Sequence, residues 1–371
     1  MEIEGSNPSR VANSRSLESL GPLTLAGGRR AATSRLGAAL IVLALAGPEA
    51  ALAQDAPALP AGRGPAEIRD DHLLAQARLT LPAVSPHTVR EGAWTVDASI
   101  LWSNSFSWTQ DVPGEEPAER RFLLDGETLT IATTVRRGLG PHLDVGLRVP
   151  LRHRGGGALD GFIDTWHRLF KLEDAQRPSF RRNAFRVEGR TTAGEPFGGT
   201  EAAGTGLGDV ELNARWRALD GAAAGVSVAL IGRLSLPTAT GPYEGSGFGG
   251  GGQIVVGAPL GRTTDLYLGA GLTVQDPGPV RTLEYHAMRG QGFAAFEWRP
   301  WPRVSLIAET NAATRLVDNI DSYPGVHWVV NLAGRLDLTP GLRMDVGLTE
   351  NLIDQQSTTD LGLYFALGWR P

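Results

Sequence analysis

Apolar and polar residues alternate along most of the chain from residue 92 onward. In the first run, Trp94, Val96 and Ala98 alternate with Thr95 and Asp97. Successive side chains of a β-strand point to opposite faces, so this period of two predicts strands with one apolar face. Twelve runs share the pattern, mostly with the roughly ten residues of a transmembrane strand. They lie near 94–102, 129–135, 143–151, 207–217, 225–236, 252–260, 264–275, 290–299, 303–315, 325–338, 341–350 and 360–370.

The connections between these runs alternate in length. The short ones are 137–141, 218–224, 261–263, 300–302 and 339–341, and the long ones are 104–121, 153–206, 237–251, 276–289, 316–324 and 351–359. Short periplasmic turns that alternate with long outer loops are typical of outer-membrane barrels. We therefore predict an all-β fold, a transmembrane antiparallel β-barrel of twelve strands over residues 92–371. The stretch 180–191 is assigned to the loop 153–206, because a strand there would break the alternation.

A soluble β-sandwich also alternates apolar and polar residues, so the composition of the polar face matters. That face is built mainly from small residues. A crowded barrel interior needs small residues, whereas a solvated sheet face does not. The small positions are Gly146, Ser227, Ala229, Gly257, Gly269, Gly271, Ala333 and Gly347. They favour the membrane barrel over the sandwich.

The tryptophans are sorted by their position along the strands. Those at predicted periplasmic strand ends are Trp94, Trp216, Trp298 and Trp369, and those at outer ends are Trp102 and Trp328. Indole rings gather at both membrane interfaces, where the ring lies in lipid and the N–H lies near water. The pattern predicts two membrane girdles and outer-membrane lipid as a partner.

One segment of the long loop 153–206 has helical rather than strand spacing. Residues 158–172 predict a short amphipathic helix with Phe162, Ile163, Trp166 and Phe170 on its apolar face. Loops of this length are usually functional or ordered by packing. We interpret the helix as a gate or cap over the barrel mouth. A helix on the membrane surface and a helix packed on its own loop as cover are the alternatives.

The same segment carries a family resemblance. Its residues are Leu159, Asp160, Gly161, Phe162, Ile163, Asp164, Trp166, His167 and Phe170, followed by Arg182, Asn183, Phe185 and Arg186, with residues 122–127 before them. This pattern resembles an uncharacterised bacterial family of predicted outer-membrane barrels, the domain of unknown function numbered three-one-eight-seven. The resemblance covers about residues 70–371. It implies an outer-membrane barrel and supplies no activity and no catalytic residues.

The N-terminal part of the chain resembles a targeting segment. An apolar run over 37–47 follows three arginines, and Ala51-Leu52-Ala53 follows the run. A run of this length matches a signal-peptide core and is too short to span a membrane. We expect an unstructured extension over 1–28, a signal peptide over 29–53 cleaved after Ala53, and an irregular periplasmic segment over 54–91. The exported chain then depends on periplasmic chaperones and the barrel-assembly machinery.

Composition excludes several classes of function. The chain has 371 residues, a formal net charge of −5 and no cysteine. The absence of cysteine excludes disulfides, cysteine-ligated metals and a thiol nucleophile, and the acidic balance argues against nucleic acid as a partner. Asp160, Asp164 and His167 share one helix face and could hold a divalent metal, but a solvated face is the simpler interpretation. We predict no catalytic residues, no metal site and no cofactor.

Charged and polar residues on the predicted lumen face form two groups. Glu309 and Asn311 lie in the middle of one strand. Across the tight turn at 339–341, Arg335 faces Asp345 and Asp337 faces Arg343, which predicts two cross-strand charge pairs near the periplasmic mouth. We interpret all six residues as a lumen network rather than as a catalytic centre.

A twelve-strand lumen is narrow, and its predicted charges are mixed in sign. The sequence therefore favours a narrow or gated channel or transporter for small solutes in the bacterial outer membrane. The alternatives are an enzyme that modifies lipid at the outer leaflet, for which no nucleophile and base can be identified, and a structural or adhesive barrel that uses the loop 153–206.

Overall fold

The computed structural model describes residues 63–109, 122–172, 176–221, 225–245, 247–276, 282–321, 323–351 and 358–370. The predicted extension 1–28 and signal peptide 29–53 lie outside these residues. Within the described ranges, no helix combines the length and the apolar character needed to cross a membrane.

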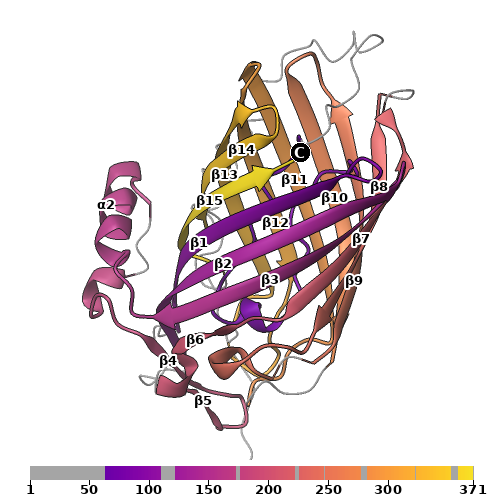
Figure 1. The fold of residues 1–371 in the computed structure, drawn as a ribbon. Coiled ribbons are helices and arrows are strands. Elements are labelled where there is room, and N and C mark those ends of the chain that lie inside the picture. Colours follow the sequence, from indigo (N-terminus) through magenta and orange to yellow (C-terminus); the bar gives the residue numbers. More distant parts are fainter. Residues whose placement is uncertain are drawn as a thin grey trace, which may run out of the picture. The chain divides into compact units, whose positions relative to one another are not determined.

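Twelve antiparallel strands form a closed β-barrel (Figure 1). They are β1 (Trp94–Trp108), β2 (Phe122–Gly140), β3 (Leu143–Gly155), β7 (Val210–Leu219), β8 (Ser227–Leu236), β9 (Gly249–Pro259), β10 (Thr264–Gln275), β11 (Met288–Trp301), β12 (Val304–Thr314), β13 (Val326–Thr339), β14 (Leu342–Glu350) and β15 (Leu361–Trp369). Each of them pairs with the next of these strands along the chain, and β15 pairs with β1 to close the ring. The predicted fold class and strand number are confirmed.

Short and long connections gather at opposite ends of the barrel, which we call the turn end and the loop end. The loop after β3 carries the helix α2 (Asp160–Phe170), close to the predicted 158–172, and the short strands β4 (Arg186–Arg190), β5 (Pro196–Gly198) and β6 (Gly204–Leu207). Strand β4 pairs with the loop end of β2 and stays outside the closed ring. The remaining short elements are the 3-10 helices η2 (Ala75–Ala77), η3 (Arg177–Ser179), η4 (Thr200–Ala202) and η5 (Gly241–Tyr243).

Residues that alternate along the sequence lie on the two opposite faces of the barrel wall. Ile100 of β1, Ile131 of β2 and Leu151 of β3 are direct neighbours, and each is exposed on the outward face. Side chains of the other parity point inward, and Ala132 and Ala229 are buried there. Five of the six predicted girdle tryptophans are exposed on the outward face, namely Trp94, Trp216, Trp298, Trp328 and Trp369. The sixth, Trp102, is partly buried under residues of the α2 region.

Residues 63–91, which we call the lumen segment, run through the interior of the barrel. The segment begins at the turn end, where Arg63 donates to the carbonyl of Pro302. It reaches the loop end at η2 and returns to the turn end, where Glu91 bridges Gly138 next to the start of β1. Residues 63–91 are the described part of the segment 54–91, which we expected to lie in the periplasm. Their irregular conformation agrees with that expectation, but their position inside the barrel does not.

The lumen segment bonds to side chains of the wall and not to a strand ladder. Its backbone N–H groups donate to inward-facing acceptors along its length: Ala66 to Glu309, Leu79 to Gln275 at 2.8 Å, Leu81 to Gln291 at 2.8 Å and Val89 to Asp144 at 2.9 Å. A strand ladder produces a period of two, whereas bonds to scattered side chains impose no period. This explains why the sequence pattern gave no sign of the segment's position.

Candidate functional site: the occupied lumen

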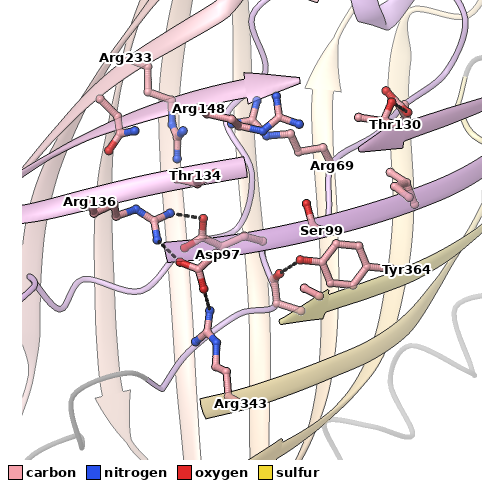
Figure 2. A pocket seen from close by; sticks show the side chains of 16 residues that line it. Arg69, Asp97, Ser99, Thr130, Thr134, Arg136, Arg148, Arg233, Arg343 and Tyr364 are labelled. Atoms are coloured by element: carbon pink, nitrogen blue, oxygen red, sulfur yellow. Dashed lines mark hydrogen bonds and ion pairs between the residues drawn. The ribbon is translucent and has the colours of Figure 1, made fainter. Parts of the chain in front are cut away.

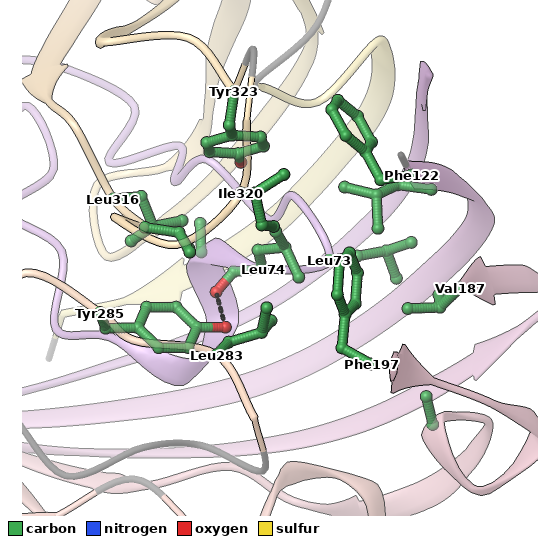
Figure 3. Packing of buried hydrophobic residues seen from close by; sticks show 14 residues of the cluster. Leu73, Leu74, Phe122, Val187, Phe197, Leu283, Tyr285, Leu316, Ile320 and Tyr323 are labelled. Carbon is green, nitrogen blue, oxygen red and sulfur yellow. Dashed lines mark hydrogen bonds between the residues drawn. The ribbon is translucent and has the colours of Figure 1, made fainter. Parts of the chain in front are cut away.

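The loop end of the barrel is closed by an apolar cluster (Figure 3). Leu73 and Leu74 of the lumen segment pack against side chains from the barrel wall and three loops, namely Phe122, Val187, Phe197, Leu283, Tyr285, Leu316, Ile320 and Tyr323. The hydroxyl of Tyr285 also donates to the carbonyl of Leu74 at 3.3 Å. The apex of the lumen segment is therefore part of the core that covers this end of the barrel.

Below this cluster, a cavity separates the lumen segment from the wall formed by β1, β2, β3, β7, β8, β14 and β15. Its volume is about 60 Å³, which leaves room for only about four water molecules. Five arginines and three carboxylates line it (Figure 2): Arg69, Arg136, Arg148, Arg233, Arg343, Glu67, Asp71 and Asp97. This cavity is thus small, polar and rich in arginine.

The first ion-pair network of this cavity is centred on Glu211 of β7. Arg69 of the lumen segment binds its two carboxylate oxygens at 2.8 Å each. Arg148 and Arg233 of the wall approach the same carboxylate at 3.3 and 3.7 Å. Three guanidinium groups therefore surround one buried carboxylate, and one of the three belongs to the lumen segment.

The second network is centred on Arg136 of β2. Its guanidinium binds Glu67 of the lumen segment at 2.5 Å and Asp97 of β1 at 3.4 Å. Arg343 of β14 binds the other oxygen of Asp97 at 3.0 Å. The lumen segment thus contributes one acid and one base to two networks that are otherwise built from barrel strands.

A larger cavity of about 270 Å³ opens at the turn end. Six arginines line it, from the lumen segment, the wall and the C-terminal end: Arg63, Arg90, Arg136, Arg215, Arg343 and Arg370. Glu67 is the one carboxylate among its lining residues. This entrance to the barrel is strongly basic.

The predicted charge pairs at the 339–341 turn are present in register, since Asp337 faces Arg343 and Arg335 faces Asp345. Arg335 and Asp345 form a bidentate ion pair at 2.8 Å, and both side chains are buried. Arg335 also donates to the carbonyl of Gly64 at 2.8 Å. The other two charges have partners that the turn geometry did not suggest: Arg343 binds Asp97, and Asp337 lies 3.5 Å from Arg63.

The predicted lumen residues Glu309 and Asn311 both point inward. Glu309 is buried and accepts hydrogen bonds from the backbone of Ala66 and from Asn331. Asn311 lines a separate small cavity beside the lumen segment, and its amide has no hydrogen-bond partner among the described residues. Glu309 therefore holds the lumen segment and does not line an open pore.

Helix α2 does not lie over the barrel mouth, which corrects its interpretation as a gate or cap. Ile163 is fully buried in a cluster with Leu159 and Leu361, against which Trp102, Trp166 and Leu363 pack. Trp102 and Leu363 are paired neighbours on the outward face of β1 and β15, and Figure 1 shows α2 beside the barrel wall. The amphipathic pattern identified the buried side of the helix but could not identify the surface that buries it.

Two other predicted residues of α2, Phe162 and Phe170, lie on its exposed side. Phe162 and Phe170 are 45% and 54% exposed, and both contact the Trp166 ring, which is partly buried. An exposed aromatic face on the outer side of a barrel is the arrangement that the membrane-surface alternative expects.

Polar side chains are buried between α2 and the outward face of the wall. Arg177 binds Asp160 at 2.6 Å, Asn104 at 2.6 Å and also Asp360. Burial alone lowers the pKa of the nearby His167, but Glu350 and Asp360 outweigh this effect and raise that pKa above its usual value. Asp164 pairs with Arg182 instead, so Asp160, Asp164 and His167 do not form the common site that their spacing allowed.

Comparison with known proteins places the chain in a family. The family described as protein of unknown function (DUF3187) matches residues 42–370. The chain belongs to this family. The resemblance seen in the sequence is thus confirmed, and no curated protein matches the DUF3187 chain.

Several solved structures are similar to this DUF3187 protein, and the first of them supports the barrel fold. The COG4313 outer membrane channel from Pseudomonas putida F1 is 12% identical and covers 79% of this chain and 100% of its own, with a TM-score of 0.53. The Pseudomonas putida toluene transporter TodX is 8% identical and covers 82% and 98%, with a TM-score of 0.37. A FadL homologue from Pseudomonas aeruginosa is 6% identical and covers 82% and 98%, with a TM-score of 0.39.

Proposed function

We propose that this DUF3187 protein is an outer-membrane channel for small solutes, and that the lumen segment closes it. The observation that carries the proposal is the way in which the segment is held. Its backbone bonds to side chains such as Glu309, Gln275 and Gln291 and takes no part in the closed ring of strands. The segment can therefore leave the lumen without opening the barrel.

The cavity volumes support a closed state of this channel. About 60 Å³ remains between the lumen segment and the arginine-rich wall, which is too little for any solute larger than a few waters. Removal of the segment would join this cavity to the basic entrance of about 270 Å³ at the turn end. In the proposal the turn end faces the periplasm, and the signal peptide is removed after Ala53.

The charges of the wall suggest the class of solute. Arg136, Arg148 and Arg233 project into the lumen from three different strands. Rings of arginine favour anions in pores because the charge acts at short range in a narrow space. The proposed solute is therefore small and polar, with a carboxylate, phosphate or sulfate group.

Single-channel conductance in planar bilayers tests this proposal. The mature protein should give rare or no current steps, and a variant lacking 63–90 should give larger and longer steps that carry anions in preference to cations. Deletion of α2 is the matched control, and it should leave the conductance of either form unchanged because the helix lies outside the barrel. An absence of steps from the variant lacking 63–90 would favour an enzyme or a structural barrel.

A further inference from the structure

Three side chains meet beneath α2, on the outer side of the barrel and away from the lumen. His167 comes from the helix, Glu350 ends β14, and Asp360 directly precedes β15. All three residues are at least nine-tenths buried, with exposures of 4%, 5% and 5%. One ligand atom from each lies within 4.8 Å of the other two.

The charges around this cluster are out of balance. Glu350, Asp360 and the neighbouring Asp160 carry three negative charges, whereas Arg177 supplies one positive charge to Asp160 and Asp360. With His167 in the neutral form that metal coordination requires, the cluster has a net charge of −2, from three carboxylates and one guanidinium. Buried charge is unfavourable unless it is paired or coordinated to a metal. A divalent cation would neutralise this cluster.

The polar atoms of the cluster lie at ion-pair distances from one another. Neither ring nitrogen of His167 nor Oε2 of Glu350 has a hydrogen-bond partner in the described part of the chain. The Nε2 atom of His167 lies 3.4 Å from Oε1 of Glu350 and 3.9 Å from Oδ1 of Asp360. Two ligands that each lie about 2.1 Å from a tetrahedral zinc ion are about 3.4 Å apart. The 3.4 Å separation of His167 and Glu350 therefore matches that of two ligands around one ion, and Asp360, 3.9 Å from His167 and within 4.8 Å of Glu350, would move slightly closer on binding.

We propose that His167, Glu350 and Asp360 bind a divalent transition-metal ion, with zinc as the best fit, and that the ion fastens α2 to the outer wall. One imidazole and two carboxylates favour zinc over calcium or magnesium, which prefer oxygen ligands alone. Three protein ligands leave a fourth position for water. Arg177 holds the second oxygen of Asp360 and so directs the first toward His167. This site is independent of the proposed channel.

Calorimetric titration with zinc sulfate tests the site. The mature, tag-free protein in detergent is first dialysed against a chelator. One saturable site per chain is expected, and H167Q and E350Q should each weaken zinc binding at least about tenfold, as loss of one ligand does. H153A is the matched control, since His153 is an exposed histidine that contacts Thr205. Equal binding by H153A and H167Q, or no saturable binding by the mature protein, would overturn the proposal.

Limited trypsin digestion gives a second readout that does not depend on how zinc affinity is measured. Lys171 follows α2, and the side chain of Arg182 is 62% exposed. Zinc should slow cleavage at both positions in the mature protein at least severalfold, and it should have no effect in H167Q. Equal protection of both proteins by zinc would place the ion elsewhere and contradict the assignment. H167Q and E350Q are used as the test variants because each keeps approximately the side-chain volume at the helix–wall contact.

Discussion

Ion pairs at the turn end link the lumen segment to the wall, and they differ in how deeply they are buried. Arg335 and Asp345 are almost fully buried and share two hydrogen bonds, and Arg335 also holds the carbonyl of Gly64. The Asp337 side chain is 37% exposed and lies 3.5 Å from Arg63. An exposed pair contributes little, whereas removal of one partner from a buried pair leaves an uncompensated charge.

We predict that R335M lowers the free energy of unfolding by about 3–5 kcal/mol, because Asp345 then stays buried without its partner. D337N should lower it by less than about 1 kcal/mol, since water already screens this carboxylate. Denaturant titration in lipid vesicles, followed by tryptophan fluorescence, measures both. Equal losses for the two variants would contradict the assigned environments.

At the scale of elements, the helix α2 shows which structural features a sequence pattern can predict and which it cannot. Its position along the chain and its buried residue Ile163 could be predicted, because helical spacing of apolar side chains is a local property. Its location on the outer wall could not, because Trp102 and Leu363 offer an apolar surface that is indistinguishable in sequence from any lipid-facing pair.

The strands and one turn were predictable for a different reason. The period of two fixes which side chains face inward, and a tight turn fixes the register of its two strands. Arg335 therefore faces Asp345 as expected. The ion pairs of Arg343 and Asp337 could not be predicted, since Asp97 and Arg63 reach them only through ring closure and through the lumen segment.

We predict that I163D releases α2 from the wall, because it places a charge in the apolar contact with Leu159 and Leu361. Trypsin should then cut at Lys171 and Arg182 at least severalfold faster, while the thermal unfolding of the barrel itself stays unchanged. L169D is the control, since Leu169 is 70% exposed, and it should leave the cleavage rate as it is. Unchanged cleavage of I163D would mean that Ile163 does not hold the helix.

For the whole molecule, the decisive feature is a barrel with its own N-terminal segment inside. The wall could be predicted from sequence, but the occupant could not, because residues 63–91 bond to scattered side chains and carry no period. A signal was nevertheless present in the wall. Glu297, Glu309, Gln275 and Gln291 are large acceptors on an inward face that the sequence predicted to be built mainly from small residues.

Cysteine labelling of the otherwise cysteine-free chain tests most directly whether the segment occupies the lumen. Ala83 is fully buried between the segment and the wall, and Arg90 is exposed at the turn end. In the folded mature protein, a water-soluble maleimide should react with A83C on the order of 100-fold more slowly than with R90C, because reaction at Ala83 requires local opening. In denaturant the two rates should be equal. Equal rates in the folded protein would show that the lumen segment is not inside the barrel and would contradict the proposed closed channel.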